Sequence, residues 1–328
     1  MTAKNSCLLT LVFALCLSLP TASFPAEKQR VAYPSLGLAL SPSWVTLEKG
    51  FWRKYGLDVE LILLSGGGKM VPALVSGSVQ ILFASDPEVT TAITRGVDLT
   101  KLGVTANTFG ASLVTQPDIQ SIRDLKGKVL GVGRGRDASY IRLVKLLRDN
   151  GINPNDEVKF LPIGAAAAAR LQALKARVIH GTVLGPPLDQ VAAKEGLKLL
   201  VKFDAPTPVG GISTTGGFLK QNRSLIINFL KGYMEGIHYL LTQKEESLKV
   251  IARYLRNPDM SIVGYFYDDI ADRVERDLRP KPESVRFLNE LVAADNPNTM
   301  LLGETDHWDL SLIEEIRRSG FVEQLYKK

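Results

Sequence analysis

The chain has 328 residues, of which 45% are hydrophobic and 23% are charged, and its formal net charge at pH 7 is +6. This length favours two domains, because single hydrophobic cores stop growing at about 250–300 residues, and this composition excludes disordered and fibrous proteins. Lysine and arginine are scattered without a long basic run, which argues against nucleic acid as a partner.

The first residues have the pattern of an export signal. Lys4 precedes an uncharged apolar run over residues 8–19, and small residues follow at 21–23. The run is shorter than the ~20 residues that a membrane-spanning helix needs, and the small residues suit cleavage after Ser23. We expect residues 1–23 to be a signal peptide and the mature chain to be periplasmic or otherwise extracytoplasmic.

Both cysteines, Cys7 and Cys16, lie inside this segment, so the mature chain would have neither disulfides nor thiolate metal sites. Leu15 is larger than the small residue that lipoprotein processing requires before Cys16. A buried amino-terminal helix, a retained anchor and lipid attachment at Cys16 are the alternatives to a cleaved signal.

Strand and helix patterns then alternate along the chain. Ser41 as the N-cap and Pro42 at the first helical position start the first helix, and Gly56 ends it. The spacing of apolar residues predicts strands over 29–35, 57–64, 79–84 and 99–106, with helices over 41–56, 69–75 and 86–95 between them.

The same order recurs in a second block. Its predicted strands cover 128–132, 158–163, 180–184 and 197–203, and its helices cover 137–148, 165–175 and 187–194. Two such blocks imply two similar α/β lobes, each with a largely parallel sheet covered by helices.

The rest of the chain has helical patterns only, over 222–243, 245–255, 261–277, 282–294 and 311–319. This part lacks strands, so it has to pack on an existing lobe, and we expect that lobe to be the first. We expect lobe I over residues 27–111 and 213–328, and lobe II over 112–212. If segments 112–115 and 210–215 are both crossing strands, they form a two-stranded hinge that opens and closes, and ordinary linkers are the alternative.

Several segments carry a family resemblance. They are VAYPS at 31–35, EKGFW at 48–52, YGLDVEL at 55–61, DLKGK at 124–128 followed by GV at 131–132, ALKA at 173–176 and GFV at 320–322. In this order and spacing the chain resembles periplasmic solute-binding proteins of ABC importers, of the nitrate/sulfonate/taurine and thiamine-pyrimidine-precursor type. The resemblance implies the type II periplasmic-binding-protein fold, with two α/β lobes, a two-stranded hinge and a ligand between the lobes. It does not fix the ligand.

The candidate site follows from the predicted sheets. Ligands of open parallel sheets bind beyond the carboxyl ends of the strands, where loops meet helix N-termini that present unpaired N–H groups. The ligand-binding residues predicted at these positions are Ser41, Ser43, Trp44, Gly67, Ser85 and Asp86 in the first lobe, and Gly133, Arg134, Arg136, Asp137, Ser139, Gly164 and Pro186 in the second.

Arginine pairs with a carboxylate or sulfonate through two parallel hydrogen bonds, so we expect Arg134 or Arg136 to meet an anionic ligand. Solvated surface arginines are the alternative. Capping of the helix is the alternative for Ser41, core packing for Trp44, and a plain helix start for Ser85 and Asp86.

Enzyme motifs are not found. The stretch at 131–136 departs from G-x-G-x-x-G at Arg136, no G-x-S-x-G occurs, and His180, His238 and His307 have no metal-ligand spacing. We expect no catalytic residues, no cofactor and no metal. The sequence predicts a monomeric substrate-binding component of an ABC importer, which captures a small anionic or polar organic solute and delivers it to a membrane permease. A thiamine-pyrimidine synthase-like enzyme of the same fold and a ligand-sensing receptor subunit are the alternatives.

Overall fold

The computed structural model describes residues 28–36, 40–64, 68–84, 86–133, 138–164, 166–293 and 306–327. The predicted signal peptide lies outside the described residues. So do Gly67, Ser85, Arg134, Arg136 and Asp137 of the predicted site, and the side chain of Asp86.

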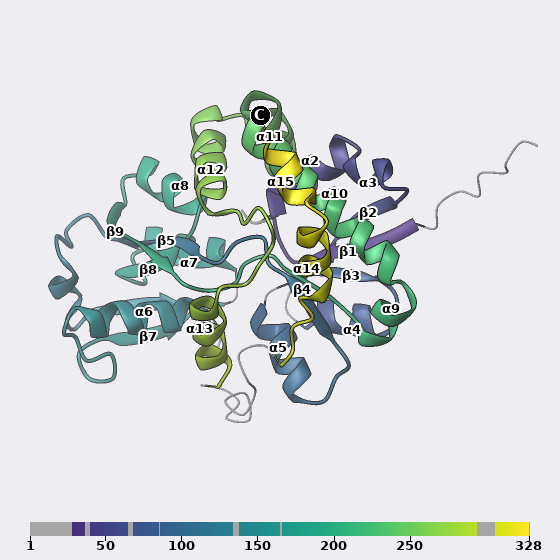
Figure 1. Ribbon diagram of the computed structural model, residues 1–328. Helices are drawn as coiled ribbons and strands as arrows, with labels where there is room; N and C mark the ends of the chain where they lie inside the picture. Colours follow the sequence, from purple (N-terminus) through teal and green to yellow (C-terminus); the bar gives the residue numbers. More distant parts are fainter. Residues whose placement is uncertain are drawn as a thin grey trace, which may run out of the picture.

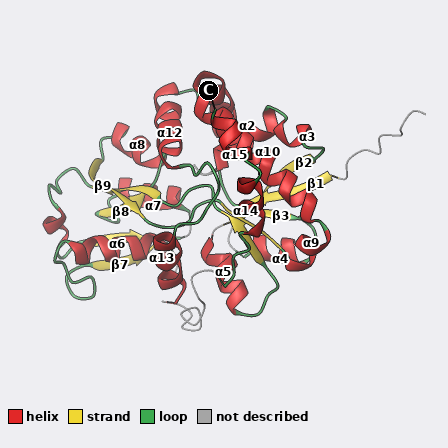
Figure 2. Ribbon diagram, viewed as in Figure 1, coloured by secondary structure: helices red, strands yellow, loops and turns green. Residues whose placement is uncertain are grey.

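The strands form two five-stranded sheets (Figures 1 and 2). The first has the order β2-β1-β3-β10-β4 and is built from β1 (Lys28–Tyr33), β2 (Asp58–Leu63), β3 (Ile81–Ala84), β4 (Thr100–Gly103) and β10 (Gly211–Thr214). The second has the order β7-β6-β8-β5-β9 and is built from β5 (Phe109–Thr115), β6 (Val129–Val132), β7 (Lys159–Pro162), β8 (Gly181–Leu184) and β9 (Lys198–Ala205).

Each sheet contains one antiparallel strand, and each of these strands follows a crossing from the other sheet. β10 enters the first sheet antiparallel between β3 and β4, and β5 enters the second antiparallel between β8 and β9. The other printed pairs, β1 with β2 and β3, and β6 with β7 and β8, are parallel. Four of the five strands in each sheet therefore run in one direction, as the prediction of a largely parallel sheet implies, and the remaining strand, β10 or β5, runs against its neighbours.

The helices follow the predicted order with additions. Those of the two blocks are α2 (Ser41–Glu48), α3 (Phe51–Lys54), α4 (Met70–Val75), α5 (Asp86–Thr94), the 3-10 helix η3 (Ile122–Leu125), α6 (Ala138–Asp149), α7 (Ala167–Lys175) and α8 (Leu188–Lys194). The C-terminal part contains α9 (Gly216–Gln221), α10 (Arg223–Thr242), α11 (Lys244–Leu255), α12 (Met260–Arg273), α13 (Pro282–Ala293), α14 (Ser311–Arg318) and α15 (Phe321–Tyr326). The sequence did not predict α9 and α15.

The first predicted helix is two helices in the structure. Gly50 has φ 72, a left-handed backbone that glycine adopts at little cost, and it separates α2 from α3. The N-cap of α2 is Leu40, which makes no side-chain cap bond, so Ser41 lies in the first turn and is not the predicted N-cap.

The C-terminal helices build the core of the first lobe. Trp52 of α3 stacks on Phe229 of α10, with ring centroids 5.0 Å apart, and its indole N–H donates to the Phe229 carbonyl over 3.1 Å. Phe83 of β3 and Tyr233 complete the cluster, with their centroids 4.9 Å apart. Each fully buried large apolar side chain contributes roughly 1.5–3 kcal/mol, so this cluster fixes α10 to the sheet.

The hinge contains a third segment beside the two crossing segments. Residues 104–108 and 206–210 join the sheets, and Ala106 forms an antiparallel bridge to Val209. Ala106 also bridges Val274, and the Glu275 N–H donates to the Thr105 carbonyl over 2.8 Å. This pairing is the reason that α12 ends at Arg273 instead of at residue 277.

Two C-terminal helices contact the second lobe as well as the first. Tyr265 of α12 donates to Asp189 of α8, and Lys194 forms an ion pair with Asp259 just before α12. α13 lies between α5 and α6, where Ile141 packs against its apolar side chains (Figure 1). The prediction that this part packs on the first lobe thus omits its contacts with the second.

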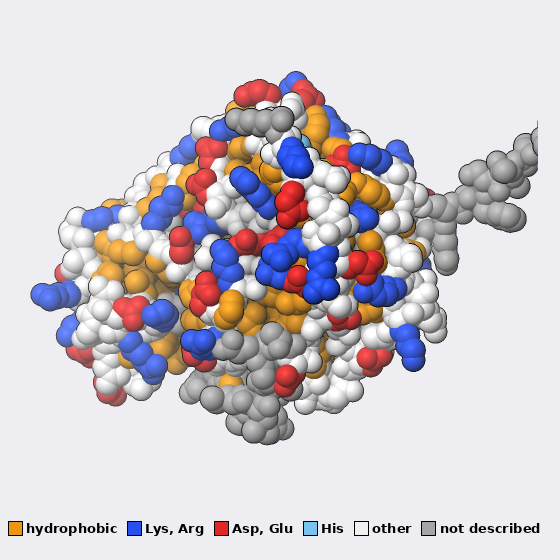
Figure 3. Space-filling model, viewed as in Figure 1, with side chains coloured by type: hydrophobic (Ala, Val, Ile, Leu, Met, Phe, Trp, Pro, Cys, Tyr) orange, Lys and Arg blue, Asp and Glu red, His pale blue; other side chains and the backbone are white. Residues whose placement is uncertain are grey.

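The visible surface carries both charge signs in close mixture (Figure 3). Arg279 pairs with Glu314, and Lys281 lies 2.9 Å from Glu275, so many of these charges neutralise one another locally. No helix in the described ranges has the length and apolar content to cross a bilayer.

Candidate functional site

The carboxyl edges of the two sheets are directed toward each other. β4 and β9 run parallel to the central strands of their sheets, and each ends in a five-residue link that starts the antiparallel strand of the other sheet. An antiparallel strand begins where its parallel neighbours end. Both links therefore run from one carboxyl edge to the other, which places the predicted ligand-binding loops of the two lobes on facing sides.

In the first lobe the predicted residues at the start of α2 are buried. The Ser43 hydroxyl donates to the Leu40 carbonyl over 2.6 Å, and Ser41 has no exposed surface. Trp44 is also fully buried and stacks on Tyr254, with centroids 5.0 Å apart. This placement favours core packing as the role of Trp44, whose contact with a ligand stays a prediction.

A pocket of about 440 Å³ lies between α4 and α5 in the first lobe. Its lining includes residues in the first turn of each helix. Burial raises the pKa of Glu88 in the first turn of α5. The lining residues are Gly68, Val71, Pro87, Glu88, Thr91, Ala92, Arg95 and Val97.

In the second lobe a hydrogen bond joins the end of β6 to the start of α6. The Gly133 N–H donates to the Ser139 hydroxyl over 2.9 Å, and Ser139 is buried in the first turn of α6. Gly164 has φ 133, a backbone region that side-chain-bearing residues rarely adopt, so this strand end requires glycine. Pro186 follows β8 and forms a cis peptide with Pro187.

Two side chains at this edge were missed by the sequence analysis. Phe109 is the first residue of β5, and the Arg142 guanidinium carbon lies 4.1 Å from the centroid of its ring. The ring also lies against Gly185, where an added Cβ would be 2.6 Å from Phe109 Cζ. Arg142 follows Ser139 at a helical i, i+3 spacing, which is the sequence signal that could have found it.

A cavity of about 340 Å³ lies beside the hinge, between α12 and strands β5 and β9. Arg273 lies 2.6 Å from Asp204 and 3.1 Å from Asp269. Burial raises the pKa of the Asp269 carboxyl, and the charge of Arg273 opposes that rise. These charged side chains already pair with one another between α12 and β9. The cavity is therefore a weaker candidate for solute capture than the carboxyl edges of the sheets. The lining residues are Gly110, Ala111, Lys202, Phe203, Asp204, Tyr265, Asp269 and Arg273.

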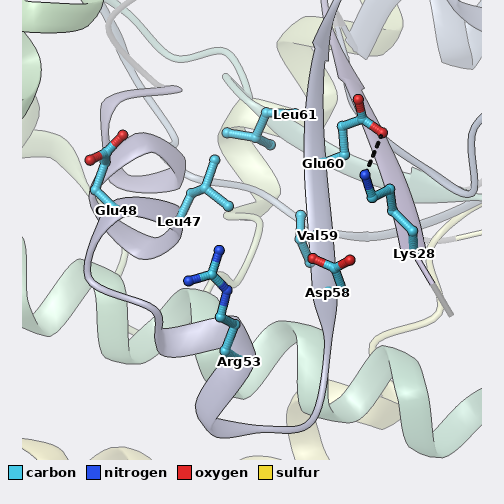
Figure 4. Close-up of a pocket in the computed structure, with 8 residues that line it drawn as sticks. All are labelled: Lys28, Leu47, Glu48, Arg53, Asp58, Val59, Glu60 and Leu61. Carbon is cyan, nitrogen blue, oxygen red and sulfur yellow. Dashed lines mark ion pairs between the residues drawn. The ribbon is translucent and has the colours of Figure 1, made fainter. Parts of the chain in front are cut away.

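A charged pocket of about 510 Å³ lies at the opposite edge of the first sheet (Figure 4). It includes Lys28 and Asp58, the first residues of β1 and β2, and Lys28 pairs with Glu60 over 3.7 Å. The amino ends of parallel strands are not where such sheets bind ligands, so this pocket is set aside. Within the described ranges, no group of three His, Cys, Asp or Glu side chains could hold a metal ion.

Comparison with known proteins gives the family. Residues 40–247, more than half of the chain, match the family described as NMT1/THI5 like. The chain belongs to the NMT1/THI5-like family. The match confirms the predicted resemblance to solute-binding proteins of the sulfonate and thiamine-precursor type.

Relatives and structures extend the comparison of this NMT1/THI5-like chain. A protein of Brucella abortus (strain 2308) named as a binding protein is 22% identical over 231 residues, which are 69% of this chain and 71% of the relative. The periplasmic aliphatic sulphonate-binding protein SsuA from Escherichia coli superposes with a TM-score of 0.69 at 17% identity, covering 88% of this chain and 99% of that chain. The desulfurization enzyme DszB, in complex with biphenyl-2-sulfinic acid, gives 0.68 at 11%, covering 89% and 99%.

At these identities the structural matches show the fold. The bilobal periplasmic-binding-protein fold predicted from the sequence is confirmed, and it is shared by solute-binding proteins and by an enzyme.

Proposed function

We propose that this NMT1/THI5-like protein is the extracytoplasmic substrate-binding component of an ABC-type importer. It captures a small anionic or polar organic solute between its lobes and delivers it to a membrane permease. The observation that carries this proposal is that the carboxyl edges of the two sheets are directed toward each other across two five-residue links, with helix starts at both edges. The family and the named binding function of the Brucella relative support it.

The proposed site combines both lobes. Ser41 and Ser43 in the first lobe and Gly133, Ser139, Gly164 and Pro186 in the second occupy the strand ends and helix starts that such a site uses. We include Gly67, Ser85, Asp86, Arg134, Arg136 and Asp137 from the sequence alone.

The lobe division and the export signal belong to the same proposal. The predicted boundaries at 111/112 and 212/213 fall within β5 and β10, the strands that follow the two crossings, which supports a chain that changes lobe near these points. The signal pattern over residues 1–23 supports export, and amino-terminal sequencing of protein from a periplasmic fraction tests cleavage after Ser23.

Native mass spectrometry of gently purified protein tests the binding function. We expect a small molecule bound to a monomer with one equivalent per chain. The same molecule, added back to ligand-free protein, raises the thermal midpoint because it binds the folded state. Small-angle scattering with and without it measures closure of the lobes. If no solute from a cell extract binds, the proposal is wrong.

The DszB comparison makes an enzyme of the same fold the second candidate. Incubation of the co-purified solute with catalytic amounts of protein separates the two. A binding protein returns the solute unchanged, whereas steady turnover identifies an enzyme.

A further inference from the structure

Arg142 lies on the side of α6 that faces the carboxyl edge of the second sheet. It is half-buried, and it comes one helical turn after Ser139, whose hydroxyl accepts the hydrogen bond from Gly133 at the end of β6. Residues three apart on a helix share a face. The Arg142 side chain therefore lies on the same face of α6 as Ser139, which is hydrogen-bonded to the end of β6.

Phe109 fixes where the Arg142 side chain ends. The guanidinium carbon lies 4.1 Å from the centroid of the Phe109 ring, a distance at which a cation is attracted to the ring face. Phe109 pairs with Ala205 at the end of β9 and packs against Gly185 just beyond β8. Because both neighbours mark carboxyl ends of strands, the guanidinium lies at the carboxyl edge and not on the outer surface of the lobe.

The first turns of α6 also face the other lobe. Ile141 packs against the buried cluster of α13 formed by Leu288, Leu291 and Val292, and α13 contacts α5 of the first lobe. In Figure 1, α13 lies beside α6 and close to α5. The Arg142 charge is consequently held on the interlobe side, where closing lobes exclude water.

An arginine in this position suits one ligand chemistry. Its N–H donors lie in one plane and form two parallel hydrogen bonds with a carboxylate or sulfonate, while an aromatic ring supports its flat face. Charges attract more strongly where water is partly excluded, so a half-buried arginine selects an anion more sharply than a solvated one.

We propose that Arg142 is a specificity-determining residue of this protein, which recognises an oxyanion group, sulfonate or carboxylate, on the solute. This inference rests on the proposed binding function and narrows its solute class to organic oxyanions. Phe109 positions the guanidinium.

The test uses calorimetric titration of the full mature chain with a matched panel. The panel holds the C2–C8 alkanesulfonates, benzenesulfonate, taurine, and the carboxylate and primary amide of each skeleton. We expect at least one oxyanion to bind and its amide to bind much more weakly. Arg142→Gln should weaken binding of the oxyanion by about 30-fold or more and leave binding of the amide unchanged, since it removes one partner of a half-buried charged pair.

Two further variants control for folding and for charge alone. Arg142→Lys keeps the cation but loses the planar donor pair, so its affinity should fall between wild type and Arg142→Gln. Lys145→Gln removes an exposed cation from the same helix, where it pairs with Asp149 over 2.9 Å, and should bind as wild type does. Circular dichroism and thermal melting show whether each variant is folded.

The outcomes separate this inference from the proposed function. If wild type binds an oxyanion and folded Arg142→Gln binds it equally well, the role of Arg142 is refuted and the binding function stands. If wild type prefers the amides, or if the solute bound from a cell extract is neutral, the role of Arg142 is likewise refuted and the binding function stands. If neither panel nor extract yields a bound solute, both proposals fall.

Discussion

The Tyr265 hydroxyl donates a hydrogen bond to Oδ2 of Asp189 over 3.1 Å, and this bond joins α12 to α8. Asp189 is fully buried in the second lobe. Its Oδ2 also accepts from the Ser112 hydroxyl over 2.9 Å, and its Oδ1 accepts the Gln190 N–H over 2.8 Å. A carboxylate removed from water needs such donors, so a helix anchored in the first lobe helps to stabilise a charge buried in the second.

Tyr265→Phe should therefore destabilise the protein although it removes a single oxygen. The Asp189 carboxylate loses one of its donors, and hydrogen bonds to charged groups contribute about 1.5–3 kcal/mol. Equilibrium unfolding in urea measures the loss. Tyr326→Phe is the matched control, because the buried Tyr326 hydroxyl has no hydrogen-bond partner among the described residues. Equal stabilities of the two variants would show that the Tyr265–Asp189 bond contributes nothing.

Two glycines in C-terminal helices should respond oppositely to alanine. A Cβ on Gly236 of α10 would overlap the Thr46 side chain of α2, whereas a Cβ on Gly264 of α12 meets no atom within 4 Å among the described residues. Overpacking costs about 1–3 kcal/mol, and alanine exceeds glycine in helix propensity by about 1 kcal/mol. We expect Gly236→Ala to lower and Gly264→Ala to raise the free energy of unfolding. If Gly236→Ala is as stable as wild type, α10 and α2 move apart enough to accommodate the added Cβ at little cost.

The burial of Trp44 leads to a prediction that separates stability from binding. Its ring lies between Tyr254 and Phe266, at 5.0 and 6.4 Å between centroids, and its Nε1 has no hydrogen-bond partner among the described residues. Trp44→Ala should cost about 3–5 kcal/mol because it leaves a cavity, while Trp44→Phe should cost less. If Trp44 acts only in the core, folded Trp44→Phe keeps the affinity for the co-purified solute. A selective loss of affinity in this variant would make Trp44 a ligand contact.

Local patterns account for the parts of the fold that the sequence predicted. Short apolar runs between helix signals gave both β-α-β-α-β-α-β blocks, and helical spacing gave most of the C-terminal helices. The places of β5 and β10 inside the sheets, each between two strands that run the opposite way, were not predictable in this way. Pairings such as Phe109 with Ala205 join residues far apart in the chain, and no local pattern records such a pairing.

In the candidate site, too, local patterns predicted some residues, and contacts between distant parts of the chain determine the others. Ser139 was predicted because it stands in the first turn of a helix after a strand. Arg142 stands one turn later, and its placement depends on Phe109, which reaches this edge only because β5 enters the sheet antiparallel. The contact between Ile141 of α6 and the apolar residues of α13 likewise cannot be predicted from local sequence patterns.

The stability of the protein should fall on acidification partly through His307. Its side chain is only 5% exposed, and its carbonyl accepts the Lys101 N–H over 3.1 Å. Burial, and then the positive charge of Lys101, lower the pKa of His307 from 6.5 to about 4. The unfolded chain therefore binds a proton at this residue at a higher pH than the folded chain does.

Between pH 6.5 and 4 the unfolded state holds the extra proton, so the free energy of unfolding decreases as the pH falls through this window. A depression from 6.5 to about 4 corresponds to a loss of roughly 3 kcal/mol. His307→Gln removes this group, and its stability should decline less between pH 7 and 4 in urea titrations. His238→Gln, a substitution on α10 beside Tyr326, serves as the matched control. Parallel declines in wild type and His307→Gln would show that the buried imidazole does not contribute to acid sensitivity.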